Sequence, residues 1–251
     1  MRSQSGIPLK SRLFIGTAGW AIPKIHAPNF PAEGSHLERY ATVFSTAEIN
    51  SSFYRHHRRS TYERWATSVP DQFRFSVKAP RWVTHSDWLD ISSDLEAFFA
   101  ELDGLGIKLG PVLIQLPPKR TFISSDADRF LSAFRRPRDV DIVLEPRHAS
   151  WFGAEAEDLL REYRISRVAA DPPPAVEADE PGGRKGLTYI RLHGSPEIYR
   201  SSYSRDRLKL VANRMIATAG SMAWCIFDNT TSYAAAGDAL ALKKIIGSEP
   251  F

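Results

Sequence analysis

The sequence has a single cysteine and no long apolar run. One thiol excludes a disulfide within the chain, and Cys225 lies in the apolar stretch 224–227, so we expect a small buried hydrophobic residue there. No segment approaches the roughly 18 apolar residues of a membrane span. The basic start, 1–10, lacks the apolar core of a secretory signal. These absences predict a cytoplasmic protein without membrane association.

Several motifs that announce an enzyme class are also missing. The chain has no GxGxxG or Walker A loop, which disfavours the common nucleotide-binding folds, and no GxSxG elbow for a nucleophilic serine. The formal net charge of +4 is small beside that of dedicated nucleic-acid-binding modules. Composition therefore indicates no particular reaction. The interpretation depends instead on the order of the predicted strands and helices.

Short apolar segments recur about every 30 residues and alternate with helical patterns, as expected of repeated βα units. We predict a TIM-type (β/α)8 barrel over 13–251, preceded by a flexible tail over 1–12; an open doubly wound sheet is the alternative. Four prolines and three glycines in 172–187 predict that a loop replaces the sixth helix. The predicted strands are 13–16, 46–50, 73–78, 112–115, 142–145, 168–171, 189–193 and 223–227.

Two helix starts carry recognisable capping patterns. Ser35 is the predicted N-cap of a helix that runs to about Phe44, with an apolar face toward the core. A second helix is predicted to open at Ser60 or Thr61, with Glu63 completing a capping box. Further helices are predicted near 94–102, 126–134, 154–163, 204–217 and 233–246.

Polar side chains stand where nearly every predicted strand ends. Barrel enzymes place their reactive groups at the carboxyl ends of the strands, so these side chains are the candidate site. Within the second strand, Ala47 and Ile49 share one face, whereas Glu48 and Asn50 share the other. The candidates are Thr17, Trp20, Glu48, Asn50, Tyr54, Lys78, Gln115, Glu145, Arg147, His148, Asp171, Arg191, His193, Asp228 and Asn229.

Six motifs in order resemble one family. They are GTAGW at 16–20, EINSSFY at 48–54, FRFSVK at 73–78, QLPP at 115–118, EPRH at 145–148 followed by Trp151-Phe152, and RLHG at 191–194. The chain is similar to the YecE-like family, domain of unknown function 72, from Leu13 to the last helix. That resemblance implies a TIM-barrel-like fold and no agreed reaction. Asp228, where the family often has Asn, and 29–31 depart from its pattern.

Acid/base chemistry is the first hypothesis for the site. Glu48, Glu145 and His193 would move protons, because neighbouring carboxyl groups in a partly dry mouth can be tuned to different pKa values. The alternative is a structural network in which nearby cations neutralise the carboxylates. Lys78 could form a Schiff base if desolvated, but pairing with Glu48 or Glu145 is the simpler expectation.

The same side chains suit an anion better than a metal. Lys78, Arg147 and Arg191, with His85 and His193, would bind phosphate or carboxylate. A divalent metal could be held by His193 with Glu48, Glu145, Asp171 and Asp228, although the cations oppose it and no ligand-spacing motif supports it. We therefore expect no cofactor, although a divalent metal is possible. The expected binding partner is a small anionic ligand.

The basic stretch 55–59 supports a second class of function. With Phe53, Tyr54 and Trp82 it could follow a nucleic-acid backbone while aromatic rings stack on bases, or it is a solvated rim. The leading interpretation remains an enzyme, a hydrolase, isomerase or lyase, that acts on a small anionic or sugar-like substrate. Thr17, Trp20, Asn50, Tyr54, Lys78, His85, Gln115, Arg147, Arg191 and Asn229 are the predicted substrate contacts. A nucleic-acid binding or processing protein is the alternative.

Overall fold

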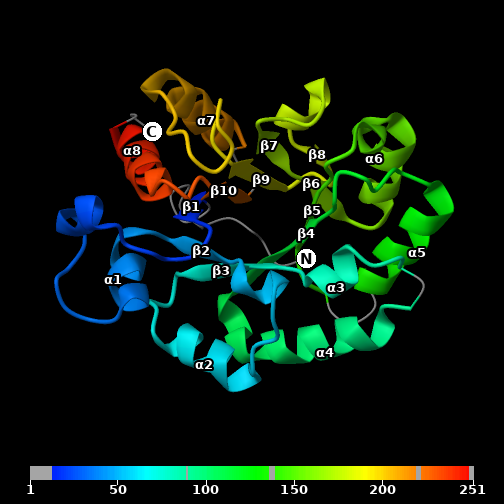
Figure 1. Cartoon of the computed structure of the whole chain (residues 1–251), viewed down its shortest axis with the longest axis horizontal. Helices are drawn as coiled ribbons and strands as arrows, with labels where there is room; N and C mark the ends of the chain where they lie inside the picture. The colour runs from blue at the N-terminus through cyan, green and yellow to red at the C-terminus, as the bar shows by residue number, and fades with distance from the viewer. Residues whose placement is uncertain (1–12, 89, 136–138, 219–221, 249–251) are drawn as a thin grey trace, which may run out of the picture.

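A computed structural model describes residues 13–88, 90–135, 139–218 and 222–248. The predicted tail over 1–12 and two of the basic residues after the fifth helix, Arg136 and Arg138, lie outside these ranges. In Figure 1 the strands gather in the middle and the helices lie around them. The strands are β1 (Leu13–Thr17), β2 (Thr46–Ile49), β3 (Arg74–Lys78), β4 (Leu109–Gln115), β5 (Ile142–Glu145), β6 (Ile165–Arg167), β7 (Ala169–Asp171), β8 (Gly182–Gly183), β9 (Leu187–Leu192) and β10 (Met222–Phe227).

The helices follow the strands as the βα repeat predicts. The α-helices are α1 (His36–Val43), α2 (Arg59–Thr67), α3 (Arg81–Thr84), α4 (Ser92–Leu102), α5 (Ser124–Arg135), α6 (Ala154–Glu162), α7 (Arg205–Ala217) and α8 (Ala234–Ser248). Short 3₁₀ turns are η2 (Lys24–Asn29), η3 (Ser51–Phe53), η4 (Asp103–Lys108), η5 (Ala149–Phe152) and η6 (Val176–Asp179). No helix in the described ranges is long and apolar enough to cross a membrane.

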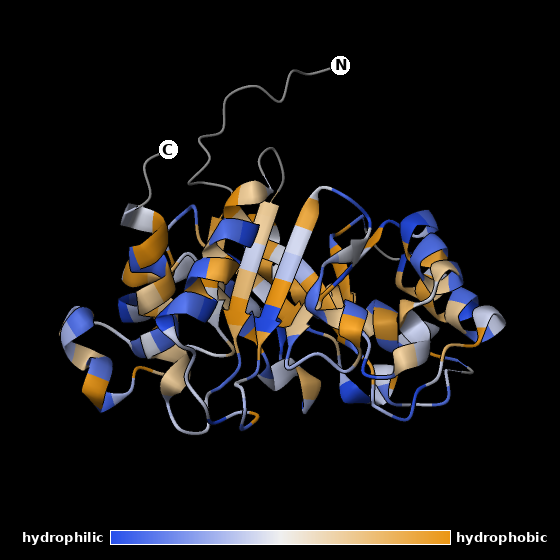
Figure 2. Cartoon of the chain, turned by 90° about the horizontal axis from the view of Figure 1, so that it is seen from above, coloured by the Kyte–Doolittle hydropathy of each residue, from blue (hydrophilic) through white to orange (hydrophobic). Residues whose placement is uncertain are grey.

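The strands form a closed parallel barrel with two weak seams. Hydrogen-bonded neighbours run β1-β10-β9-β7 and β2-β3-β4-β5-β6-β8. The two sets meet where Ala18 bridges Glu48 and the Gly19 N–H donates to the Glu48 carbonyl at 2.8 Å. They meet again at Val168, between β6 and β7, whose N–H donates to the Leu144 carbonyl at 2.9 Å. The predicted TIM-type barrel is therefore confirmed, and Figure 2 shows central strands pointing toward one edge.

Three local predictions need comment. The predicted sixth strand, 168–171, is too short: pairing begins at Ile165, and the segment is divided between the two strand sets. The loop predicted in place of the sixth helix is confirmed; it holds η6 and β8, which pairs antiparallel with β6. The predicted N-cap at Ser35 is confirmed, and the structure adds a capping box with Glu38. The capping box predicted at Ser60 or Thr61 is wrong, because α2 starts at Arg59 and Arg58 provides no side-chain cap.

Alternation along the strands divides the core into two layers. Ala47, Ile49, Phe75 and Val77 pack outward against helices, as the period-2 pattern predicts. A smaller cluster fills the barrel interior, where the ring of Phe14 stacks on Trp224 at 4.3 Å between centroids. The same alternation turns the other residues of each strand inward. The polar residues at the carboxyl ends therefore face one another above this apolar plug.

Candidate functional site

Four strands bring five charged or titratable side chains together at the carboxyl end of the barrel. Glu48 comes from β2, Glu145 from β5 and Arg191 from β9; His193 follows β9 and Asp228 follows β10. Glu48, Glu145, Arg191 and His193 have no exposed surface, and Asp228 is 6% exposed. We call these five residues the charged cluster.

Arg191 binds all three carboxylates of the charged cluster. Its Nε and Nη2 donate to the two oxygens of Glu48 at 3.1 and 2.7 Å, which is a bidentate pair. Nη1 donates to Glu145 Oε2 at 2.6 Å, and Nη2 also reaches Asp228 Oδ2 at 3.1 Å. A single guanidinium therefore holds carboxylates from three different strands.

His193 links Glu145 to Asp228, and it shares the Asp228 Oδ2 atom with Arg191. Its Nε2 lies 2.8 Å from Glu145 Oε1 and its Nδ1 lies 3.0 Å from Asp228 Oδ2. Arg147 reaches the same pair, with Nε 3.2 Å from Glu145 Oε1 and Nη2 3.1 Å from His193 Nε2. The imidazole can exchange a proton with either carboxylate, so the chain Glu145–His193–Asp228 connects the sealed interior to the partly open mouth.

Electrostatics keep three members of the cluster charged. Burial alone would raise the pKa of Glu145, but Arg147, Arg191 and His193 outweigh it and hold that pKa well below the usual range. Asp228 follows the same logic: burial opposes ionisation, and Arg191 with His193 lowers its pKa. Burial would lower the pKa of Arg191, yet the three carboxylates raise it well above its usual value. Glu145, Asp228 and Arg191 are thus each held in the charged form at neutral pH.

A tyrosine anchors the cluster from below. The Tyr189 hydroxyl donates to Glu48 Oε2 at 3.0 Å and lies 2.7 Å from Ser76 Oγ. Burial, reinforced by the Glu48 charge, raises the pKa of Tyr189 well above its ordinary value, so the hydroxyl keeps its proton. Glu48 therefore has a donor on each side and is held in one orientation.

Lys78 reaches the mouth without a partner. Its ammonium lies 4.1 Å from the centre of the Phe53 ring, and it forms no ion pair with a carboxylate in the described ranges. The expected pairing with Glu48 or Glu145 is thus wrong, because Arg191 already occupies the facing oxygens of both. Burial, followed by repulsion from Arg191, lowers the pKa of Lys78 to about 8.

One more predicted contact touches the charged cluster: Gln115, at the end of β4, donates to Glu145 Oε2 at 3.2 Å. Asn50 and Trp20 instead line a separate cavity of about 390 Å³, together with His36 and Ser51. The Trp20 ring packs edge-on against Trp65 of α2 and against Phe75. The Oδ1 atom of Asn50 is buried and has no hydrogen-bond partner in the described structure. This oxygen could accept a hydrogen bond from a ligand.

The remaining predicted residues are engaged elsewhere. Thr17 Oγ1 donates to the Gly19 carbonyl at 2.6 Å, and its N–H donates to the Tyr40 hydroxyl at 2.8 Å. His85 pairs with Thr84 and packs edge-on against Phe53, at the rim. Tyr54 is 70% exposed and does not turn toward the cluster.

Asn229 and Asp171 belong to a second polar network, which joins the strand ends to α7 and α8 rather than to the charged cluster. Asn229 donates to the Ser201 carbonyl at 2.9 Å and to Asp238 Oδ2 at 2.7 Å, which fixes the start of α8. Asp171 binds Arg207 and the Tyr203 hydroxyl instead of joining His193. Within the described ranges no group of three or more His, Cys, Asp or Glu side chains is arranged to hold a metal ion.

Ser76, Tyr199 and Ser52 also contribute to the site, although no role was predicted for them from the sequence. Ser76 belongs to the 73–78 motif, and its hydroxyl supports Tyr189. The Tyr199 ring stands edge-on to His193 at 5.9 Å and is 43% exposed, so it covers the imidazole. Tyr199 lies in a loop, so neither helical nor strand periodicity indicates where its side chain points. Ser52 Oγ donates to the Lys78 carbonyl at 2.7 Å, and only its place in the 48–54 motif hinted at a contact.

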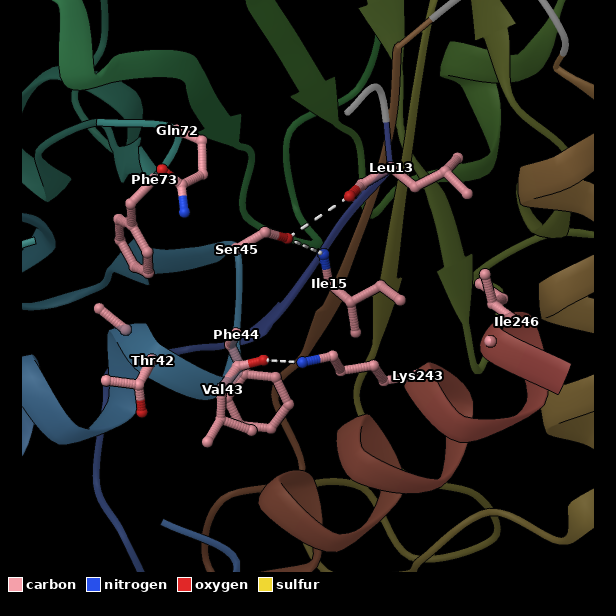
Figure 3. Close-up of a pocket in the computed structure, with 12 residues that line it drawn as sticks. Leu13, Ile15, Thr42, Val43, Phe44, Ser45, Gln72, Phe73, Lys243 and Ile246 are labelled. Atoms are coloured by element: carbon pink, nitrogen blue, oxygen red, sulfur yellow. Dashed lines mark hydrogen bonds between the residues drawn. The ribbon is translucent and has the colours of Figure 1, made fainter. Parts of the chain in front are cut away.

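Another cavity lies at the opposite end of the barrel. It measures about 360 Å³ and is lined by residues at the amino ends of β1 and β2, by Phe73 and by α8. Figure 3 shows Lys243 of α8 reaching the Val43 carbonyl and Ser45 bridging Leu13 and Ile15. The amino end of a TIM barrel ordinarily serves stability, and the charged cluster lies at the other end.

Relatives support the family resemblance. The chain is 28% identical to the UPF0759 protein YunF of Bacillus subtilis over 197 residues, which is 72% of this chain and 70% of that protein. A solved DUF72 family protein from Thermotoga maritima superposes with a TM-score of 0.76 at 23% identity, over 94% of this chain and 99% of that one. The crystal structure of a 3-keto-D-glucoside 4-epimerase from E. coli shares the fold, with a TM-score of 0.52 at 9% identity over 93% and 98% of the two chains.

The family model agrees with these matches over nearly the whole chain. The model described as "Protein of unknown function DUF72" matches residues 14–250, which includes every strand of the barrel and every member of the charged cluster. The chain therefore belongs to the DUF72 family, together with the YecE-like proteins.

Proposed function

We propose that this protein is an enzyme that acts on a small anionic or sugar-like substrate by acid/base chemistry at the carboxyl end of the barrel. The charged cluster is the observation that carries the proposal. Three carboxylates, a guanidinium and an imidazole meet with almost no access to water. Such a set of fixed charges can stabilise charge that develops on a bound molecule.

Stability alone gives little reason for this cluster. Taking an ion out of water costs several kcal/mol, and buried ion pairs can often be replaced by apolar residues without loss of stability. The cluster also stands above an apolar plug that already fills the barrel interior. A polar layer placed on a complete apolar core is better explained by chemistry at the mouth than by folding.

The groups that border the mouth favour an anionic or hydroxylated ligand. Arg147, with 15% of its side chain exposed, and Lys78 supply positive charge. Gln115 supplies an amide beside Glu145, and the separate cavity at Asn50 and Trp20 adds a second amide and an aromatic wall. Hydroxyl groups pair well with amides and carboxylates, and sugar rings pack on aromatic faces. The sugar substrate of the E. coli epimerase adds a reason to test sugars, although only the fold is shared.

Hydrogen exchange tests for proton removal from carbon, which isomerases and lyases share, without assuming which of these reactions follows. We would incubate the protein in D₂O with sugars, sugar phosphates and sugar acids, and follow deuterium entry at carbon by NMR. Glu145→Gln keeps the shape of the side chain but removes the charge beside Arg191 and His193. We expect exchange with at least one substrate, lost in Glu145→Gln and kept in the exposed control Glu63→Gln. Equal exchange in both variants would refute the assignment of the site.

A nucleic-acid function is the second candidate, and one observation favours it. The exposed ring of Tyr54 stands beside the exposed Arg55 and Arg58. Other members of the stretch are engaged: His56 pairs with Glu101 at 2.8 Å, and Arg59 pairs with Glu63 at 3.0 Å. Binding to single-stranded DNA that weakens steeply with salt, and disappears on changing Arg55 and Arg58 to Ala, would support this function. Absent binding at low salt would remove it.

A further inference from the structure

Lys78 is held at the carboxyl end of β3 with its amine toward the barrel mouth. Alternation along β3 turns Ser76 and Lys78 inward, and Ser76 meets Tyr189 inside the barrel. Ser52 donates to the carbonyl of Lys78 at 2.7 Å, which ties the end of β3 to that of β2. The Phe53 ring lies 4.1 Å from Nζ and closes one side of the amine. Only 6% of the residue is exposed.

The amine is left uncommitted by its surroundings. Arg191, Arg147 and His193 occupy the carboxylates of the charged cluster, and none of those oxygens lies within 4.0 Å of Nζ. Within the described ranges the Lys78 ammonium has no hydrogen bond or ion pair, and its close contact is with the Phe53 ring. A lysine placed to neutralise the cluster would touch a carboxylate. Lys78 is instead free to meet a molecule that enters the mouth.

The environment also raises the neutral fraction of the amine, although the ammonium remains the major form at pH 7.5. Burial and the Arg191 charge lower the pKa of Lys78 to about 8, against the pull of Glu48, Asp228 and Glu145. At pH 7.5 the neutral fraction is then about two orders of magnitude above that of an ordinary lysine with a pKa near 10.4. A desolvated lysine beside a second cation is a recognised way to activate an amine nucleophile.

We propose that Lys78 forms an imine with an aldehyde or ketone substrate bound at the mouth, an inference that rests on the proposed enzymatic function. The nitrogen lone pair forms the C–N bond while the carbonyl π electrons move onto oxygen. That oxygen takes one proton from the new ammonium and one from solvent at the mouth. The C–O bond then breaks, water leaves, and an iminium remains that eases proton removal from the adjacent carbon.

Trapping with borohydride tests the proposal directly. The protein would be incubated at pH 7.5 with pyridoxal 5′-phosphate or with glyceraldehyde, reduced with sodium borohydride, digested and mapped by mass spectrometry. The lower basicity of Lys78 offsets part of its larger neutral fraction, so we expect labelling about tenfold above exposed lysines such as Lys24 and Lys244. The two probes separate attraction to a phosphate from reaction at a carbonyl.

Two variants complete the test. Lys78→Arg keeps the positive charge but cannot form an imine, so both label and deuterium exchange should be lost; Lys244→Arg should retain both. If Lys78 is labelled no more than Lys24, the imine proposal is overturned. If Lys78→Arg exchanges deuterium normally while Glu145→Gln does not, the acid/base function stands and the imine is wrong. If Lys78 is trapped but no substrate exchanges, the amine is reactive and the proposed acid/base function fails. Circular dichroism of each variant confirms that it is folded.

Discussion

Replacing Arg191 by methionine is expected to destabilise the fold strongly. Methionine fills much of the volume but leaves Glu48, Glu145 and Asp228 without the guanidinium that contacts all three at 2.6–3.1 Å. Removal of one partner from a buried ionic group typically costs about 3–5 kcal/mol. Urea unfolding at pH 7.5, followed by tryptophan fluorescence, measures the loss. The matched control is Arg59→Met, whose ion pair with Glu63 is exposed and contributes at most about 1 kcal/mol.

The pH dependence of the same variant sharpens the prediction. In the native protein the pKa values of Glu145 and Asp228 are lowered, so their stabilisation is present above the unfolded values, near 4, and is lost as pH falls through the folded values. Arg191 is the main group that lowers the pKa of Asp228 against the effect of burial. Without Arg191, burial should therefore raise the pKa of Asp228 above its unfolded value. The variant should then gain stability from pH 7.5 to 5. Two results would refute the claim that Arg191 compensates the buried carboxylates. One is a decrease of less than about 1 kcal/mol in the free energy of unfolding, and the other is a difference from the native protein that grows as the pH falls.

Three further outcomes are expected. Glu145→Gln should reduce deuterium exchange by about 100-fold or more in the folded protein. It should also lower the free energy of unfolding, because an amide can keep the contact with Arg191 but not the buried charge that Arg191, Arg147 and His193 face. Activity that depends on the neutral Lys78 amine should rise with pH through about 8, and Lys78→Arg should lack that limb; kinetics from pH 6 to 9.5 measure it. Cys225 should resist a disulfide reagent until denaturant is added, since burial raises the pKa of its thiol.

The βα repeat predicted where the charged cluster lies but not which candidates form it. Glu48, Glu145 and Arg191 were among fifteen candidates at the strand ends, and the structure brings these three together at one mouth. The loop in place of the sixth helix followed from proline and glycine, which exclude a regular helix there. These features depend on local chemistry and on a repeated unit, and both are visible in one sequence.

Pairing within the mouth was beyond the sequence because it depends on register between strands. Glu48 and Lys78 end neighbouring strands, so a salt bridge looked natural; the structure gives both Glu48 oxygens to Arg191, which arrives from β9 across the barrel. Asn229 also stands at a strand end, yet its amide turns to Asp238 of α8. The pairing partner of each side chain depends on distances in the folded structure, and these distances cannot be read from spacing along the chain.

The division between occupied and free groups bears on how the site would work. The most conspicuous charges, Glu48 and Arg191, satisfy each other and have no access to solvent, so they are suited to fix a field rather than to touch a substrate. Less conspicuous groups have hydrogen-bonding capacity left in the described structure: the amine of Lys78 and the buried carbonyl oxygens of Asn50 and Asn229. An unpaired buried acceptor costs about 1–3 kcal/mol, and a ligand that donates to it recovers that cost. A substrate should therefore be recognised by the groups that folding left unpaired, while the charged cluster beneath them sets the protonation of whatever binds.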